Sequence, residues 1–184
     1  IPRNPFAMYH VDPDHKEREF LTLDELTAMT EIKLEDPNMA FARDLFIFGC
    51  WTGISFIDIK NLTEDNICIV NGAPWIVSKR QKTGVPFQIK LMDIHIQIIE
   101  RYKSFRKDNH LFNIVNLDSI NKRIKKVAVM CGIKKRVSFH VSRHSWAVLA
   151  LEYGMPIESV SKILGHTNRT PTPIYAKGTR RKLQ

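Results

Sequence analysis

An Asn71-Gly72 pair near the middle of the chain limits the folds that this sequence can adopt. The pair lies between two short apolar runs, 67–70 and 75–77, and Asn-Gly favours the tight turn that joins two antiparallel strands. A third run, 85–91, has the length of another short strand. We therefore expect a small three-stranded antiparallel sheet in this segment.

Apolar residues on both sides of the hairpin recur at helical spacing. The capping-box pattern of Thr22 and Glu25 predicts the start of a first helix. Further helices are expected over about 38–52 with a stop at Gly53, from Met92 onward, from about Ile120 to Gly132, over 140–153, and from Pro156 to Gly165. The predicted fold class is mainly α (α+β), a helical core with a small three-stranded antiparallel sheet.

The composition fits one domain with a polyanionic partner. The 184 residues, 43% of them hydrophobic, are enough for one core, and the proline-containing polar segment 1–19 is expected to be a linker. Lys plus Arg number 28 against 19 Asp plus Glu, a net charge of +9, which favours nucleic acid ahead of an acidic membrane surface. With no apolar run near the roughly 20 residues that span a bilayer and no signal peptide, we expect a cytoplasmic protein without a membrane partner.

The cysteines predict neither a disulfide framework nor a metal site. Cys50, Cys68 and Cys131 are odd in number and widely spaced, and they are interpreted as small apolar residues. We expect no metal and no cofactor.

The last third of the chain carries residue types suited to phosphate chemistry in a fixed order. His140 and Arg143 are three residues apart at a predicted helix start, so both can reach one phosphate. His166 follows a Leu-Gly pair, and Tyr175 follows a proline-rich segment. Arginine can bind two phosphate oxygens, histidine can transfer protons, and a tyrosine hydroxyl can attack phosphorus. Taken singly, each has an ordinary explanation as a solvated, capping or packing residue.

The ordered set His-x-x-Arg, Leu-Gly-His and Tyr resembles the catalytic signature of the tyrosine recombinase (phage integrase) family. Residues 52–62 resemble the family's first conserved box, and 81–84, Gln-Lys-Thr-Gly, resemble the hairpin that carries its catalytic lysine. The likeness covers roughly Phe20 to Lys182. It implies that 20–184 form the catalytic domain of a recombinase, with the family's separate N-terminal core-binding domain absent from this chain.

The resemblance implies a reaction in which the Tyr175 hydroxyl attacks a DNA phosphodiester, forms a 3′-phosphotyrosine and releases a 5′-hydroxyl. A second 5′-hydroxyl then reverses the step, and no ATP is needed because the covalent intermediate keeps the bond energy. The residue types of the site describe phosphoryl transfer without metal. Arg143 fits stabilisation of the transition state, and His140 and His166 fit hydrogen bonding and proton management. Lys82 fits the general acid for the leaving 5′ oxygen.

The first box departs from the family, which usually places an arginine where this chain has Ser55. Integrases of conjugative and mobilisable transposons resemble this chain in having a small residue there. Loss of such a contact costs on the order of 2.7 to 4 kcal/mol of transition-state stabilisation, so a replacement is expected. Our candidate is Arg43 on the preceding helix; the alternative is that Arg43 is solvated or paired with Asp44. Asp58, in the same box, is expected to orient neighbouring groups.

The segment before the proposed nucleophile is a second departure. Pro171 and Pro173 disfavour the short helix that carries the tyrosine in many relatives. We nevertheless expect Tyr175 to be the nucleophile, because Tyr153 lies in a predicted helix upstream of Leu-Gly-His and fits the order badly.

Basic residues predicted to contact DNA are Lys79, Arg80, Lys134, Lys135 and Arg136, although each cluster by itself could be a solvated face. The resemblance implies double-stranded DNA as the partner, self-association into a tetramer on DNA, and accessory DNA-bending proteins. Two other functions stay open. The last two helices could form a helix-turn-helix reader, or the chain could be a recombinase relative that lost activity with its first arginine and acts by binding DNA.

Overall fold

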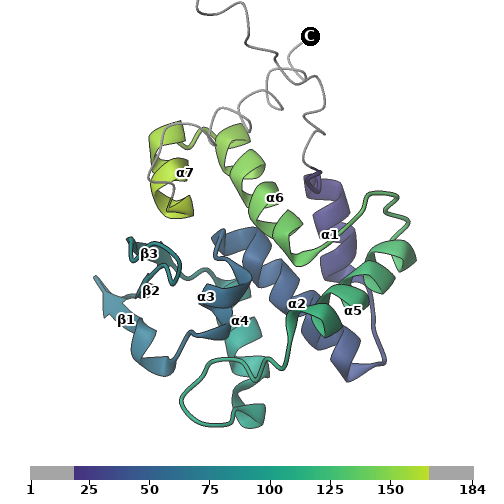
Figure 1. The fold of residues 1–184 in the computed structure, drawn as a ribbon, viewed down its shortest axis with the longest axis horizontal. Helices are drawn as coiled ribbons and strands as arrows, with labels where there is room; N and C mark the ends of the chain where they lie inside the picture. Colours follow the sequence, from purple (N-terminus) through teal and green to yellow (C-terminus); the bar gives the residue numbers. More distant parts are fainter. Residues whose placement is uncertain (1–18, 166–184) are drawn as a thin grey trace, which may run out of the picture.

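In the computed structural model of the protein, which describes residues 19–165, helices form the body of the fold and one small sheet lies at its edge (Figure 1). The α-helices are α1 (Leu23–Glu31), α2 (Pro37–Thr52), α3 (Phe56–Lys60), α4 (Asp93–Arg101), α5 (Leu117–Met130), α6 (Phe139–Glu152) and α7 (Ile157–Leu164). Two short 3-10 helices are η1 (Glu64–Asn66) and η2 (Lys103–Phe105). The predicted fold class is confirmed. None of the helices within 19–165 has the length and apolar character needed to cross a bilayer.

The sheet consists of β1 (Ile67–Val70), β2 (Ala73–Lys79) and β3 (Pro86–Lys90), antiparallel and in that order. Asn71 and Gly72 have φ angles of 50° and 75°, as a type I′ turn requires. The predicted hairpin is therefore confirmed at the turn that the sequence indicated.

Local signals set most of the helix ends. The Thr22 side chain accepts from the backbone N–H of Glu25, whose carboxylate accepts from the Thr22 N–H, so the predicted capping box begins α1. Gly53 ends α2 at a φ of 65°. The short α3 was not predicted, because five residues are too few to show a helical period.

The core is built around α2, which contacts α1, α4, α5 and α6. Its residues from Ala42 to Cys50 are buried almost continuously, because helices cover several of its faces. A Cβ at Gly49 would lie 2.7 Å from Ser142 Oγ, and one at Gly53 would lie 2.6 Å from the Trp146 ring. These two glycines let α6 lie close against α2.

A smaller cluster joins α6 to α7. Trp146 and Val148 of α6 pack with Val160 and Leu164 of α7. In Figure 1, α7 lies beside α6 and above the sheet, and it contacts β3. The C-terminal end of α7 is thereby held near the hairpin and the start of α6.

We expect Gly53→Ala to destabilise the fold more than Gly132→Ala. Both glycines have a left-handed φ, 65° and 71°, so either alanine costs about 1–2 kcal/mol in backbone strain. Gly132 has open space around its Cβ position, whereas the clash with Trp146 at Gly53 adds about 1–3 kcal/mol. Urea unfolding of the two variants gives the difference; equal losses would mean that Trp146 moves away without cost.

His95 is fully buried in α4, and burial lowers its pKa from 6.5 to about 4. Its Nδ1 accepts from the backbone N–H of Met92 at 3.0 Å, and its ring lies edge-on to Phe48 at 5.4 Å. The imidazole therefore packs in its neutral form.

Stability should fall between pH 6.5 and pH 4 because of His95. In that window the unfolded chain binds a proton that the folded chain does not, so the free energy of unfolding decreases as the pH falls. A shift from 6.5 to about 4 corresponds to about 3 kcal/mol, at about 1.36 kcal/mol per pKa unit. Urea unfolding as a function of pH should show this loss, and His95→Asn, which keeps an acceptor for Met92, should remove it. His110→Asn is the control, and a loss that survives His95→Asn would exclude this histidine as its source.

Candidate active site

The first turn of α6 places His140 and Arg143 next to the first box. Phe139, at the start of α6, packs edge-on against Phe56 of α3, with the ring centroids 5.1 Å apart. His140, Arg143 and Ser55 all line one open hollow of about 280 Å³ between α6 and the α2–α3 turn. The structure thus brings together two predicted catalytic residues and the position of the missing arginine.

Arg143 connects the ends of two helices. Its Nη1 donates to the carbonyl of Gly53 at 3.0 Å, and its Nη2 donates to the carbonyl of Leu164. The first carbonyl lies at the end of α2 and the second at the end of α7. Helix C-termini carry partial negative charge, so both ends favour the guanidinium group.

His140 is exposed, and its ring lies edge-on to that of His144 with centroids 4.3 Å apart. His144 is buried one helical turn further along α6. The sequence analysis did not single out His144, although the i, i+4 spacing of the two histidines is a signal that they share a face.

Ser55 and Asp58 form a compact polar turn at the start of α3. Ser55 Oγ accepts from the backbone N–H of Asp58 at 3.4 Å and donates to Asp58 Oδ2 at 2.7 Å. Asp58 Oδ1 accepts from the backbone N–H of Gln81 at 2.8 Å, and Oδ2 accepts from Arg80 Nη1 at 3.1 Å. Asp58 therefore ties the β2–β3 hairpin to the first box, the contacts of an orienting residue.

Arg80 is buried, although the sequence analysis predicted that it contacts DNA. Only 4% of the residue is exposed, its Cζ lies 4.1 Å from the centroid of the Phe87 ring, and its Nη2 donates to the carbonyl of Ile163. Burial lowers the pKa of Arg80, while the hydrogen bond and charge of Asp58 raise it. The carboxylate of Asp58 supplies the counter-charge that lets this guanidinium be buried.

Lys82 is exposed in the turn of the β2–β3 hairpin. The turn is closed by hydrogen bonds from the Arg80 N–H to the Val85 carbonyl and from the Gly84 N–H to the Arg80 carbonyl, at 2.8 and 2.7 Å. Lys82 is not among the described residues that line the hollow. The structure therefore places it on the hairpin, as the sequence predicted, without bringing it against Arg143.

The other basic residues differ in exposure. Lys79, Lys134 and Arg136 are exposed. Lys135 is half-buried, and its Nζ lies 2.5 Å from Glu25 Oε2 and 2.9 Å from the carbonyl of Phe20. Lys135 thus connects the α5–α6 segment to the start of α1.

His166 and Tyr175, with Pro171 and Pro173, lie outside the described residues. The last described residue, Gly165, ends α7 in a left-handed conformation, as the sequence predicted. A Cβ at Gly165 would lie 3.0 Å from Arg80 Cγ, so this end of the described chain lies against Arg80. Within 19–165, His, Cys, Asp and Glu side chains form no group of three or more that could hold a metal ion.

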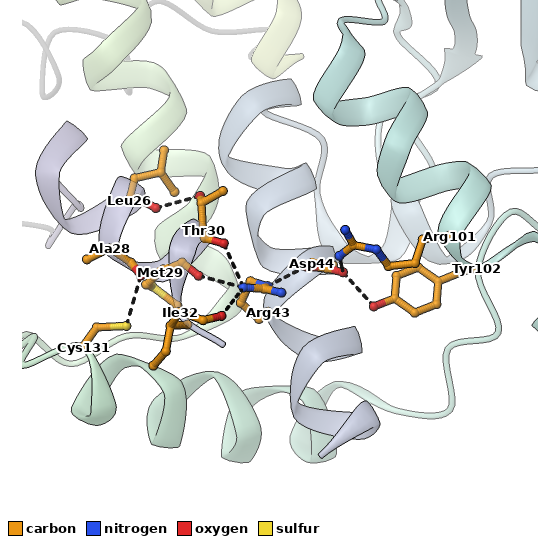
Figure 2. A network of polar contacts seen from close by, with 10 residues as sticks. All are labelled: Leu26, Ala28, Met29, Thr30, Ile32, Arg43, Asp44, Arg101, Tyr102 and Cys131. Atoms are coloured by element: carbon orange, nitrogen blue, oxygen red, sulfur yellow. Dashed lines mark hydrogen bonds and ion pairs between the residues drawn. The ribbon is translucent and has the colours of Figure 1, made fainter. Parts of the chain in front are cut away.

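Arg43 belongs to a different polar network, drawn in Figure 2. Its Nη1 donates to the carbonyls of Met29, Thr30 and Ile32 at 3.2, 3.0 and 3.1 Å, and its Nε lies 2.5 Å from Asp44 Oδ1. These carbonyls belong to the C-terminal end of α1, which has no basic residue of its own. Arg43 satisfies them from α2.

Asp44 binds three side chains in this network. Its Oδ2 accepts from Arg101 Nη1 at 2.6 Å and from the Tyr102 hydroxyl at 2.7 Å. Burial and the charge of Asp44 raise the pKa of Tyr102. The contacts of Arg43 thus agree with the alternative of an ion-paired residue next to Asp44, and they direct its guanidinium to α1 instead of to the hollow beside Arg143.

A model of the phage integrase family matches residues 19–181. The chain belongs to the phage integrase family. Among curated relatives of this integrase-family chain, a tyrosine recombinase of Pseudothermotoga lettingae is 36% identical over 163 residues, covering 85% of this chain and 55% of that protein. The tyrosine recombinase XerC of Serratia marcescens is 23% identical over 165 residues, covering 84% and 54%. The chain spans about half the length of these relatives.

Solved structures of integrase-family proteins show the same fold. The XerH site-specific recombinase bound to a palindromic difH substrate superposes with a TM-score of 0.78 at 19% identity, covering 95% of this chain and 54% of that one. The Tn1549 transposon integrase in complex with circular intermediate DNA has a TM-score of 0.69 at 17% identity, covering 95% and 67%.

In this integrase-family chain we expect Arg43→Met to lower the free energy of unfolding by about 3 kcal/mol, because three carbonyls and the buried Asp44 lose their charged donor. Arg101→Met is the control. Its side chain is 53% exposed and also pairs with Asp44, so it should cost about 1 kcal/mol or less. Urea unfolding measures both. Equal stability of Arg43→Met and wild type would contradict the structural role of Arg43.

Proposed function

We propose that this chain contains the catalytic domain of a site-specific tyrosine recombinase, which cleaves and rejoins DNA. The observation that carries the proposal is the position of His140 and Arg143 in a member of the phage integrase family. The two residues lie at the start of α6 and line the hollow beside the first box, and Arg143 also binds the end of α7. We assign 20–184 to this domain.

In the proposed reaction the Tyr175 oxygen attacks the scissile phosphorus. A P–O bond to Tyr175 forms as the P–O5′ bond breaks, the phenol loses its proton and the 5′ oxygen gains one. The product is a 3′-phosphotyrosine and a free 5′-hydroxyl, and attack by another 5′-hydroxyl reverses both changes. Since one phosphodiester replaces another, the bond energy is kept and the step needs no ATP. Positively charged side chains take the charge-stabilising role that a metal has in other phosphoryl transfers.

The proposed roles follow from the chemistry of each side chain. Arg143 stabilises the negative charge that develops on the phosphoryl oxygens, because its fork of donors is fixed by helix-end carbonyls. His140, exposed beside it, hydrogen-bonds a phosphoryl oxygen, and His166 does so from the segment that follows Gly165. Lys82, on the hairpin turn, donates the proton to the leaving 5′ oxygen.

We propose double-stranded DNA as the partner and a tetramer as the assembly on it. The net charge of +9 and the exposed Lys79, Lys134 and Arg136 support binding to a phosphate backbone, while Lys135 and Arg80 have partners within the protein. The XerH and Tn1549 integrase structures, both solved with DNA, support the same partner. The serine at position 55 and the likeness to the Tn1549 integrase favour an integrase of a mobile element.

A second candidate function is DNA binding by a relative that no longer cleaves. Ser55 favours it, because a charged contact to the transition state is missing from its usual position. The two functions differ in one product, the covalent protein–DNA adduct.

A nicked suicide substrate carrying the cognate site should trap that adduct with the wild-type chain, and Tyr175→Phe should abolish it because phenylalanine has no attacking oxygen. Denaturing electrophoresis with labelled DNA measures the adduct. Tyr153→Phe, an exposed tyrosine at the end of α6, is the control and should form the adduct normally. DNA binding without adduct by the wild-type chain would support the second candidate, and an adduct that persists in Tyr175→Phe would exclude this nucleophile.

A further inference from the structure

Because Ser55 stands where the family usually has an arginine, the first box lacks one positive charge that would stabilise the transition state. Ser55 cannot supply it, because a hydroxyl carries no positive charge; it binds the backbone and the carboxylate of Asp58 instead. Arg43 directs its donors to the end of α1. A replacement has to come from a residue whose guanidinium lies near that of Arg143.

Arg80 meets this condition. Its Nη2 donates to the carbonyl of Ile163, and Arg143 Nη2 donates to the carbonyl of Leu164, the next residue. Neighbouring Cα atoms are about 3.8 Å apart, so two guanidinium groups from distant parts of the chain meet at one helix end. A phosphate has several oxygens, so one phosphate can accept hydrogen bonds from two such forks.

The orientation of Arg80 is fixed by the first box itself. Asp58 accepts from Arg80 Nη1 at 3.1 Å, and Ser55 donates to the same carboxylate oxygen at 2.7 Å. The guanidinium also lies over the ring of Phe87, with Cζ 4.1 Å from the ring centroid. Such a group needs little rearrangement when charge develops on a substrate, which is the condition for electrostatic catalysis.

One hydrogen-bond donor of Arg80 is unsatisfied within the described part of the chain. Its Nε is buried and has no hydrogen-bond partner among residues 19–165. A buried donor without an acceptor costs about 1–3 kcal/mol, so its retention points to an acceptor supplied from elsewhere. In contrast to Arg80, Arg43 uses its own Nε to bind Asp44.

Building on the proposed function, we infer that Arg80 replaces the missing first-box arginine and binds the scissile phosphate together with Arg143, while Ser55 and Asp58 position it. The positively charged side chain thus comes from the residue after β2 instead of from the start of α3. The carbonyls at the end of α7 hold the two guanidinium groups until a phosphate oxygen takes their place.

The test compares cleavage with binding in the full chain. Arg80→Lys keeps a positive charge for Asp58 but loses the fork and Nε. It should lower the rate of adduct formation at saturating nicked DNA by about 100- to 1000-fold, the usual loss for one transition-state donor. The Kd for the same DNA and the thermal unfolding midpoint should stay close to wild type. Lys90→Met, which removes an exposed charge from the same sheet, is the control and should cleave normally.

A second variant separates catalysis from folding. Adding Ser55→Arg to Arg80→Lys returns a guanidinium to the usual position of the family and should recover most of the lost rate. Cleavage by Arg80→Lys at the wild-type rate would overturn the inference, and so would a loss that Ser55→Arg does not recover. If wild type and Lys90→Met form no adduct, the proposed function fails and this inference fails with it.

Discussion

The close approach of α6 to α2 is the contact on which the rest of the site depends. It exists because Gly49 and Gly53 carry no side chain where Ser142 and Trp146 press against α2. A Cβ at either position would lie less than 3.0 Å from a side chain of α6, so that side chain or α6 itself would have to shift. A shift of α6 would disturb the hydrogen bond from Arg143 to the Gly53 carbonyl and the hollow beside the first box. The positions of the proposed catalytic side chains thus depend on the distance between the backbones of α2 and α6.

Features that depend on neighbours in sequence could be predicted. The Asn71-Gly72 turn, the capping box at Thr22 and the glycine at the end of α2 each follow from local backbone conformation, and all three are confirmed. The strand order β1-β2-β3 follows from the short connections between consecutive strands. The short α3 could not be found this way, because its stability comes from the cap at Ser55 and from packing.

The choice of partners for buried arginines could not be predicted. The sequence predicted a place beside Arg143 for Arg43 and a DNA contact for Arg80, yet each is buried against an aspartate. Which one lies beside the first box depends on contacts 22 and 83 residues away for Arg80 and 11 to 14 residues away for Arg43. Sequence spacing pointed to the helix next to the box, whereas the fold brings the hairpin there. The pattern of residue types identified the chemistry, and only the tertiary structure showed which copy of a residue type lies where.

Neighbouring residues of the β2–β3 turn differ in how they are held. The backbone N–H of Gln81 is bound to Asp58, and Lys82, the next residue, extends into solvent. A change in the direction of the lysine side chain therefore leaves the hydrogen bonds of the preceding two residues intact. In the proposed reaction, the side chain that delivers the proton and the contacts that hold Arg80 therefore belong to separate parts of one turn. A substitution at position 82 changes proton delivery without removing a hydrogen bond that holds the turn to the first box.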